Sequence, residues 1–373
     1  MLERIFVDNF KCFVNFEWKP RKLELLLGAN GSGKTSIGRV LWQVRALVAD
    51  AVEVGTCFSS DSRTRWDRRL EQRIELDVRL EAGLYSYALT VAQDPDAING
   101  LIDSVQVKQE TLHLDETLLL SFDDGALQVF DDEGQPGPLF PTHKNRSGLS
   151  AVAEGKSTKK LNGFKRWLAD DVWLFRPDPR AITGRTDEPA RMLEPNLRNF
   201  ASWYVATITQ DLTSAVQIRD ALADVLPGFG TLGVDKQRPQ LQARFNVDSS
   251  PRASSYSIGF EELSDGQRAL VALYVLLHTI VKPGRMVLFD EPDNYVALRE
   301  IQPWLMEVID AALTSGGPQV WFISHHPELL NKLAPECGTR FFRHREGPVR
   351  IKPFDVSPGL TAAETVAREW DDE

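Results

Sequence analysis

The stretch Gly28-Ala29-Asn30-Gly31-Ser32-Gly33-Lys34-Thr35 decides the fold of this chain. It fills every fixed position of the pattern G-x4-G-K-[ST], follows the apolar run Leu23–Leu27 and precedes a helical pattern that starts at Lys34. Glycines are needed because successive backbone N–H groups can wrap a phosphate only where no side chain obstructs them. The pattern predicts a phosphate-binding loop whose contacting residues are Asn30, Gly31, Ser32, Gly33, Lys34, Thr35 and Ser36.

A second motif, the apolar strand Met286–Phe289 followed by Asp290 and Glu291, predicts the acidic partner of such a loop. Ligands gather at the carboxyl edge of parallel strands, so an acidic residue there would lie beside the phosphates. With ATP as the expected nucleotide, Lys34 would reach the β- and γ-phosphates, and Thr35 and Asp290 would bind Mg²⁺. Glu291 would orient and polarise the attacking water.

The third motif, Leu263-Ser264-Asp265-Gly266-Gln267-Arg268, resembles the LSxGQ signature of ABC-type ATPases. In that family the signature contacts the γ-phosphate of a nucleotide held by the opposite subunit. The resemblance implies a homodimer, or a higher even oligomer, in which ATP lies between the phosphate loop of one chain and Ser264, Gly266 and Gln267 of the other. Ser264 is also an ordinary helix N-cap, and both interpretations can hold together.

The fourth motif follows the apolar strand Val320–Ile323 and reads Ser324-His325-His326-Pro327. It resembles the switch-histidine loop of the same family, in which a histidine contacts the γ-phosphate. The resemblance aligns His325 with that histidine and leaves His326 as the alternative. A single histidine after a strand is usually structural, so its order behind the other three motifs carries the assignment. We therefore expect Glu291 and His325 to be the catalytic residues.

Several features place the resemblance in one branch of that family. Four segments are similar to those of SMC/RecF-like ATPases: the opening Ile5–Lys11, the paired strands of Arg73–Val91, the element Arg176–Pro179 and the signature. More narrowly, they resemble the ATPase part of the overcoming-lysogenization-defect (OLD) class and related anti-phage defence ATPases. Two features differ from the pattern of transporter ATPases. The phosphate loop and the signature are farther apart in the sequence, and the segment after Glu291 reads Pro292–Leu298.

Two departures from this branch shape the expected partners. The sequence contains no sustained heptad pattern, so it does not predict the long coiled coil of SMC proteins. OLD-class proteins carry a Toprim nuclease after the histidine loop, and we expect such a nuclease, or another effector, to be a separate protein here. The best D-loop candidate is Asn294, and the Q-loop glutamine stays open among Gln72, Gln93, Gln106 and Gln109.

Strand and helix patterns alternate along the chain and predict an α/β fold. With the resemblance, we expect a P-loop ABC-type ATPase head with a mixed or parallel sheet, a β-rich N-terminal lobe and a helical insertion. Residues 1–130 would form the N-terminal lobe, 131–163 a flexible basic loop, 164–258 the helical insertion and 259–373 the C-terminal lobe. The clearest helical pattern of the insertion runs from Phe200 to Leu226.

Composition excludes several classes of protein. With 42% hydrophobic and 26% charged residues the chain can bury a large core, so it is neither disordered nor a small disulfide-stapled protein. Cys12, Cys57 and Cys337 are far apart and have no metal-like spacing. No apolar run reaches the roughly 18 residues that span a bilayer, and no signal-peptide core opens the chain. We expect a cytoplasmic protein without membrane contact.

The net charge of −10 is unevenly distributed. Residues 143–166 hold the bases Lys144, Arg146, Lys156, Lys159, Lys160, Lys165 and Arg166 against the single acid Glu154. Such a run could follow a DNA backbone, although a charged loop is more often simply solvated. Nearby, Phe164 and Trp167 fall at helical spacing, which favours core positions over a base-stacking role. Any contact with DNA would have to be local.

Two functions remain. The first is an ATP-hydrolysing, ATP-dimerising ATPase of the SMC/RecF-like branch that acts in DNA maintenance or anti-phage defence with an effector partner. The alternative is a nucleotide-gated scaffold or sensor whose partner carries all effector chemistry, without direct action on DNA. A transporter ATPase subunit is a distant third.

Overall fold

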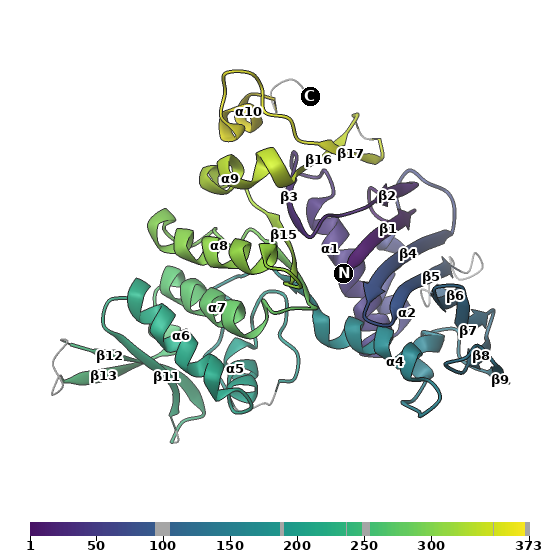
Figure 1. The fold of residues 1–373 in the computed structure, drawn as a ribbon, viewed down its shortest axis with the longest axis horizontal. Coiled ribbons are helices and arrows are strands. Elements are labelled where there is room, and N and C mark those ends of the chain that lie inside the picture. The colour runs from purple at the N-terminus through teal and green to yellow at the C-terminus, as the bar shows by residue number, and fades with distance from the viewer. Residues whose placement is uncertain (94–104, 187–189, 236, 248–253, 346, 370–373) are drawn as a thin grey trace. The chain divides into compact units, whose positions relative to one another are not determined.

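The computed structural model describes residues 1–93, 105–186, 190–235, 237–247, 254–345 and 347–369 (Figure 1). It divides into two compact units that do not follow chain order. Unit 1 comprises Met1–Val172, Gly284–Met286 and His325–Glu373, and unit 2 comprises Trp173–Pro283 and Val287–Ser324. The predicted C-terminal lobe, residues 259–373, thus contributes to both units. The predicted segment boundaries remain a proposal, and each unit is described separately.

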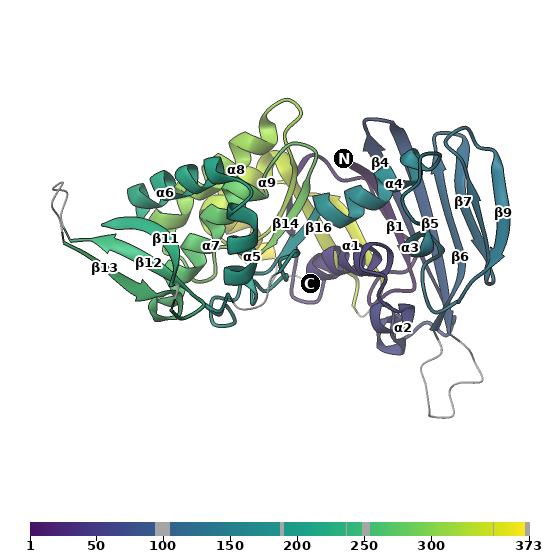
Figure 2. The same ribbon diagram turned by 90° about the horizontal axis from the view of Figure 1, so that it is seen from below.

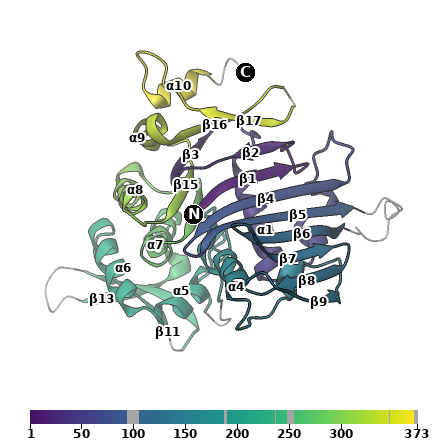
Figure 3. The ribbon, with the colours of Figure 1, turned by 45° about the vertical axis from the view of Figure 1, so that its right-hand side comes forward.

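Unit 1 is built on an antiparallel sheet of eight strands that lie side by side (Figure 3). Their order is β2 (Phe16–Trp18), β1 (Leu2–Asp8), β4 (Glu71–Leu80), β5 (Gly83–Gln93), β6 (Val105–Leu114), β7 (Thr117–Asp123), β8 (Ala126–Phe130) and β9 (Pro136–Pro141). The predicted hairpin is confirmed by the pairing of β4 with β5, in which Ile74 faces Leu89. Alternate residues of these two strands are buried, as expected of a sheet covered on one face.

The helices of unit 1 that precede residue 172 pack beside this sheet. They are α1 (Lys34–Ala49), α2 (Val54–Cys57), α3 (Gly148–Ala151) and α4 (Lys159–Arg166), with a 3-10 turn at Ser60–Ser62 and a π-turn at Trp167–Asp171. Helix α2 contacts β6, α3 and α4 contact β7, and α1 contacts α3 and α4 (Figure 2). The Phe164 ring lies 5.7 Å from that of Tyr85 and 5.4 Å from that of Tyr87. Phe164 and Trp167 are therefore core residues, as predicted.

The segment 131–163 differs from the predicted loop. It contains β9, α3 and the first part of α4. Helix α4 begins there because the Asp132 carboxylate accepts hydrogen bonds from the backbone N–H groups of Lys159 (3.1 Å) and Lys160 (2.8 Å). A carboxylate is a strong helix cap. The cap comes from a residue distant in sequence, so local periodicity could not reveal this helix start.

Unit 1 also holds three strands around the phosphate loop. Strand β3 (Leu23–Leu27) pairs in parallel with β16 (Gly338–Arg343), which pairs antiparallel with β17 (Val349–Pro353). Helix α9 (Pro327–Cys337) contacts β3 and β16, and α10 (Ala362–Glu369) contacts α9. The predicted mixed sheet is thereby confirmed.

The phosphate loop leaves β3 at a point of very close backbone approach. Gly28 has φ +141°, and a Cβ added there would lie 2.0 Å from the carbonyl oxygen of Phe341 on β16. Gly31 has φ +80° but faces open space, with nothing within 4 Å of such a Cβ. Packing therefore excludes any side chain at position 28, whereas at position 31 only the backbone conformation is unfavourable.

Unit 2 contains β15 (Gln319–Ile323) and, apart from their first residues, β10 (Val172–Phe175) and β14 (Met286–Asp290). These strands are neighbours in the order β10, β14, β15. Helices α7 (Asp265–Thr279) and α8 (Leu298–Leu313) pack together, and the Trp304 indole N–H donates to the Leu273 carbonyl oxygen at 2.7 Å. The Phe289 ring packs edge-on against Trp304, at 5.0 Å, and stacks on Phe322, at 5.7 Å. These contacts anchor the strand that ends in the acidic pair.

The helical insertion predicted for residues 164–258 is only partly helical. The pattern Phe200–Leu226 forms two helices, α5 (Phe200–Ile208) and α6 (Leu212–Val225), because Asp211 caps α6 by accepting from the Ser214 N–H at 3.1 Å. An antiparallel sheet of β11 (Phe229–Asp235), β12 (Gln240–Asn246) and β13 (Ser255–Gly259) follows, and a 3-10 turn at Phe260–Glu262 leads to the signature. Within the residues that the structure describes, no helix is long and apolar enough to cross a membrane.

Glu110 is the most deeply buried carboxylate of the large sheet, with none of its surface exposed. It accepts hydrogen bonds from the hydroxyls of Tyr87 (2.8 Å) and Ser147 (2.7 Å) and from the backbone N–H of Leu149 (3.3 Å). Burial raises the pKa of Glu110 above its ordinary value of 4.5, although these three bonds oppose the shift. The group therefore joins β6 to the start of α3 while favouring its protonated form.

This burial predicts a pH effect on stability. Because the native pKa of Glu110 lies above the unfolded value, its contribution to the free energy of unfolding falls as pH rises from about 4.5 through the native pKa. Glu110→Gln keeps acceptor capacity without a titrating group, so we expect its stability relative to wild type to improve between pH 4.5 and pH 8. Urea unfolding across that range measures the difference, and the exposed Glu116→Gln controls for net charge. A constant difference between wild type and Glu110→Gln would contradict the prediction.

The phosphate-loop glycines give a matched pair for a second prediction. Gly28→Ala should lower the free energy of unfolding by at least about 3 kcal/mol, because it adds a backbone clash to an unfavourable φ. Gly31→Ala should lower it by only about 1–2 kcal/mol, from the positive φ alone. Denaturant unfolding checks both values, and equal losses would show that β16 does not constrain Gly28.

Candidate functional site

The phosphate loop links β3 to α1 and is enclosed by its neighbours in unit 1. A Cβ added at Gly33, which has φ +101°, would meet Cys12 Sγ at 3.1 Å, Val349 Cγ2 at 3.1 Å and Phe13 Cζ at 3.2 Å. Val349 also donates its backbone N–H to the Cys12 carbonyl oxygen at 3.0 Å. The two segments beside the loop are thus held to each other, and Gly33 lies against both of them because it has no side chain.

The polar groups of the loop are arranged for an anion. Lys34 is only 7% exposed, and its Nζ donates to the carbonyl oxygens of Gly28, at 2.6 Å, and Ala29, at 3.0 Å. The Ser32 hydroxyl is buried and has no hydrogen-bond partner among the described residues. Gly33, as the N-cap of α1, supplies no side-chain cap. A buried hydroxyl and a helix N-terminus without a side-chain cap both favour a bound phosphate.

The acidic strand end lies in unit 2. Asp290 ends the fully buried strand β14 and is 2% exposed. Glu291 follows with φ +52°, a conformation that non-glycine residues rarely adopt, and its backbone N–H donates to the Ile323 carbonyl oxygen on β15 at 2.8 Å. Its Oε2 accepts from Asn294 Nδ2 at 2.7 Å. Asn294, the predicted D-loop residue, thus holds the glutamate carboxylate, while its assignment to a D-loop stays a prediction.

The signature forms a complete capping box at the start of α7. Ser264 Oγ accepts from the Gln267 N–H at 3.2 Å, and Gln267 Oε1 accepts from the Ser264 N–H at 3.1 Å. The helix-cap interpretation of Ser264 is therefore confirmed, while its phosphate contact stays a prediction. A Cβ added at Gly266 would lie 2.9 Å from the Tyr295 carbonyl oxygen. Within unit 2, the signature thus lies against the loop that follows Glu291.

The negative charge of Asp265 in the signature is balanced by two arginines. Its carboxylate pairs with Arg180 at 3.2 Å and with Arg268 at 2.5 Å. The hydrogen bond from Arg180, with help from Arg268, lowers the pKa of Asp265. The Arg180 guanidinium also lies 5.8 Å from the centroid of the Tyr295 ring, and therefore touches both the signature and the loop after Glu291. Sequence reasoning missed Arg180, although it directly follows the Arg176–Pro179 element.

The two histidines after β15 have different surroundings. His326 is the N-cap of α9, and its Nδ1 accepts from the backbone N–H of Glu328 at 3.3 Å. This role accounts for His326 structurally. His325 is half-buried and lies two residues after the end of β15, and it remains the preferred candidate for the switch histidine.

Other candidate residues have contacts of their own. Gln72, one of four Q-loop candidates, is 1% exposed, donates to the Asn9 carbonyl oxygen at 3.0 Å and accepts from the Ser62 hydroxyl at 3.1 Å. These bonds give it a structural role inside unit 1. Arg343, which sequence reasoning also missed, donates from Nη1 to the Gly31 carbonyl oxygen at 3.5 Å. No sequence motif marked this arginine, because β16 reaches the phosphate loop only through the fold.

Much of the basic charge in residues 143–166 is used inside unit 1. Lys144 pairs with Asp124 at 2.6 Å, and Lys160 donates to the Asp132 carbonyl oxygen at 2.5 Å. Lys165 donates to the carbonyl oxygens of Ser150 (3.0 Å) and Val152 (2.9 Å). These contacts favour a structural interpretation of the segment over a continuous DNA-binding track.

The chain is similar to known proteins in part of its sequence and in its fold. A family profile described as "AAA domain, putative AbiEii toxin, Type IV TA system" matches residues 201–331. No curated protein matches the chain. Among solved structures, an SMC head bound to the C-winged helix domain of ScpA is similar with a TM-score of 0.53 and 13% identity, covering 95% of this chain and 98% of that chain.

Two further SMC heads match at lower scores. The head domain from Thermotoga maritima has a TM-score of 0.46 and 13% identity, covering 95% of this chain and 99% of that one. A head with an extended coiled coil, bound to the C-terminal domain of ScpA and derived from Pyrococcus furiosus, has a TM-score of 0.46 and 12% identity, covering 100% and 98%.

At these identities the likeness concerns the fold, and the narrower resemblance to OLD-class proteins stays a prediction. The chain has a mixed α/β fold similar to that of an SMC head domain, which confirms the fold class predicted from its motifs.

Proposed function

We propose that this chain binds ATP with Mg²⁺ and hydrolyses ATP to ADP and phosphate. The observation that carries the proposal is the phosphate loop, a glycine-lined turn in which a buried serine hydroxyl and a lysine amine lie at a helix N-terminus. An SMC-head-like fold supports the same conclusion.

The residues of the loop fit a triphosphate. Ser32 Oγ is a buried donor without a partner in the described part of the chain, and a phosphate oxygen would satisfy it. The Lys34 amine now binds two neutral carbonyl oxygens, and an anionic phosphate is a stronger partner for it. Thr35 and Ser36, in the first turn of α1, would add a hydroxyl for Mg²⁺ and a backbone N–H for phosphate.

The chemistry we assign to the other residues follows from their type. Mg²⁺ bound by Thr35 and Asp290 would neutralise phosphate charge, as oxygen ligands do for this cation. Glu291 would accept a proton from the attacking water, with Asn294 holding its carboxylate in place. His325 would donate a hydrogen bond to the γ-phosphate.

The head-to-tail dimer is part of the proposal. Ser264 and Gly266 would contact the γ-phosphate of a nucleotide held by a second copy. An aspartate inside the signature would repel a phosphate, but Arg180 and Arg268 neutralise it, so the signature of unit 2 is compatible with an anionic partner.

We place this ATPase in DNA maintenance or anti-phage defence, acting with a separate effector such as a Toprim-type nuclease. The alternative is a nucleotide-gated scaffold without direct DNA action. It is favoured by contacts within unit 1 that engage three basic side chains of residues 143–166, Lys144, Lys160 and Lys165. The ATPase rate at low salt, with and without duplex DNA, separates the two. Stimulation by DNA supports direct action, and an unchanged rate supports the scaffold.

Glu291→Gln tests catalysis and dimerisation together. The variant keeps the shape of the side chain but cannot accept a proton, so we expect the hydrolysis rate to fall at least about 100-fold while ATP still binds. With ATP and Mg²⁺ the variant should then accumulate as a dimer, which light scattering detects as twice the mass of one chain. A monomer under these conditions would refute the sandwich arrangement.

The signature serine can be tested apart from its role as a helix cap. Aspartate caps a helix as well as serine does, so Ser264→Asp should keep thermal stability but repel the γ-phosphate. In a Glu291→Gln background we expect Ser264→Asp to abolish the ATP-dependent dimer. Its control is Ser264→Ala, which loses the cap and about 1 kcal/mol of stability without adding charge. Dimer formation by the aspartate variant at the level of its parent would contradict the phosphate contact.

A further inference from the structure

An exposed tryptophan lies beside the phosphate loop. Trp66 is 46% exposed, whereas the largest buried side chains of the chain include other aromatic residues such as Phe10 and Phe58. The Arg343 guanidinium lies over its ring, 5.2 Å from the centroid. Both residues belong to unit 1. Single exposed aromatic side chains are common on protein surfaces, so the informative feature is the placement of Trp66 under Arg343, an arginine that also reaches the phosphate loop.

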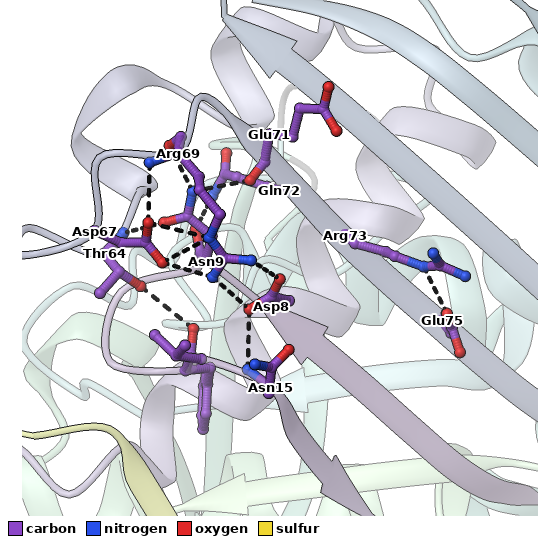
Figure 4. Close-up of polar contacts among 12 residues, drawn as sticks. Asp8, Asn9, Asn15, Thr64, Asp67, Arg69, Glu71, Gln72, Arg73 and Glu75 are labelled. Carbon is purple, nitrogen blue, oxygen red and sulfur yellow. Dashed lines mark hydrogen bonds and ion pairs between the residues drawn. The ribbon is translucent and has the colours of Figure 1, made fainter.

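The loop that carries Trp66 is fixed by a buried polar network (Figure 4). Asn9 is fully buried, and its Nδ2 donates to the carbonyl oxygens of Arg69 and Glu71, both at 2.8 Å. Its Oδ1 accepts from the Thr64 N–H at 3.2 Å, and the Gln72 amide donates to its backbone oxygen. Both ends of the loop are thereby tied to one residue.

Further bonds join this loop to the segment that lines the phosphate loop. The backbone N–H of Lys11 donates to the Ser62 carbonyl oxygen at 2.6 Å, and its Nζ donates to the Asp61 carbonyl oxygen at 2.8 Å. The Thr64 hydroxyl donates to the Phe13 carbonyl oxygen at 3.3 Å. These bonds are made by residues other than Trp66, so a substitution at Trp66 leaves all of them available to hold the loop.

Arg343 connects Trp66 to the phosphate loop. Its Nε donates to the Gly347 carbonyl oxygen at 2.8 Å, and its Nη1 reaches the Gly31 carbonyl oxygen at 3.5 Å. Gly31 is exposed and faces open space. An aromatic ring and a guanidinium, both flat, therefore lie next to the open side of the loop that would hold the phosphates.

We propose that Trp66, supported by Arg343, is the stacking surface for the nucleobase of the bound nucleotide. The inference rests on the proposed function and deepens it, because it assigns the base end of the same site. Flat aromatic side chains and guanidinium groups stack on any base, since every base has a π-face. Recognition by this surface depends on the presence of a base and requires no hydrogen-bonded readout of its edge.

The test compares ATP with inorganic tripolyphosphate, which carries the phosphates but no base. Calorimetry gives the Kd of both for wild type, Trp66→Ala and Trp66→Phe. Trp66→Ala should weaken ATP binding about tenfold and leave tripolyphosphate binding unchanged, because only ATP loses a stacking partner. Trp66→Phe keeps an aromatic face and should stay within about threefold of wild type for both ligands.

Two controls separate this inference from the proposed function. Lys34→Ala should lose both ligands, since it removes a phosphate contact. Tyr256→Ala removes another exposed aromatic side chain, 51% exposed on β13 in unit 2, and should change neither Kd. If wild type binds ATP, and Trp66→Ala weakens neither ligand or both equally, the stacking surface is refuted while ATP binding stands. If wild type binds no ATP, the proposed function fails with it.

Discussion

The contact on which the phosphate-loop motif depends is the close approach of two backbones, that of Gly28 in the loop and that of Phe341 in β16. Any Cβ at position 28 would collide with that carbonyl oxygen, so the loop can leave β3 on this path only without a side chain. The same absence of side chains lets Gly33 lie against Cys12, Phe13 and Val349. Residues from the start, the loop and the end of the chain meet there, which explains why the loop motif alone constrains so much of unit 1.

Buried polar groups give the rest of unit 1 its order. Asn9, Gln72 and Glu110 are almost completely buried, and each makes several hydrogen bonds that join segments far apart in sequence. A buried polar group without partners is costly, so such a network fixes one arrangement of its loops rather than several. In this way the loop of Trp66 gains a defined position although its tip is exposed. The buried amide groups fix the conformation of the loop, and the loop in turn fixes the position of the exposed surface that a ligand would contact.

The sequence predicted the elements whose signals are local. Periodicity and motif spacing predicted strand β3, helix α1, the hairpin of β4 and β5, strands β14 and β15 and helix α7. It did not predict the structure of residues 131–163, because the start of α4 depends on Asp132, which is distant in sequence. Nor did it predict the break at Asp211, where one side-chain cap outweighs a continuous helical pattern. For the candidate site, it supplied the motif residues but not Arg180 or Arg343, which reach the motifs only through tertiary contacts.

The signature shows why a motif residue can have a structural and a functional role at once. Ser264 completes a capping box whose two hydrogen bonds hold the first turn of α7, and the same turn presents the N–H groups that an anion would meet. Gly266 lies against the Tyr295 carbonyl oxygen, so the first turn of α7 and the loop after Glu291 constrain each other within unit 2. Arg180 adds a charge contact to Asp265 and a ring contact to Tyr295. A change at any of these positions would therefore alter the orientation of the signature and of the loop after Glu291 together, so these two motif segments of unit 2 form one packed structure.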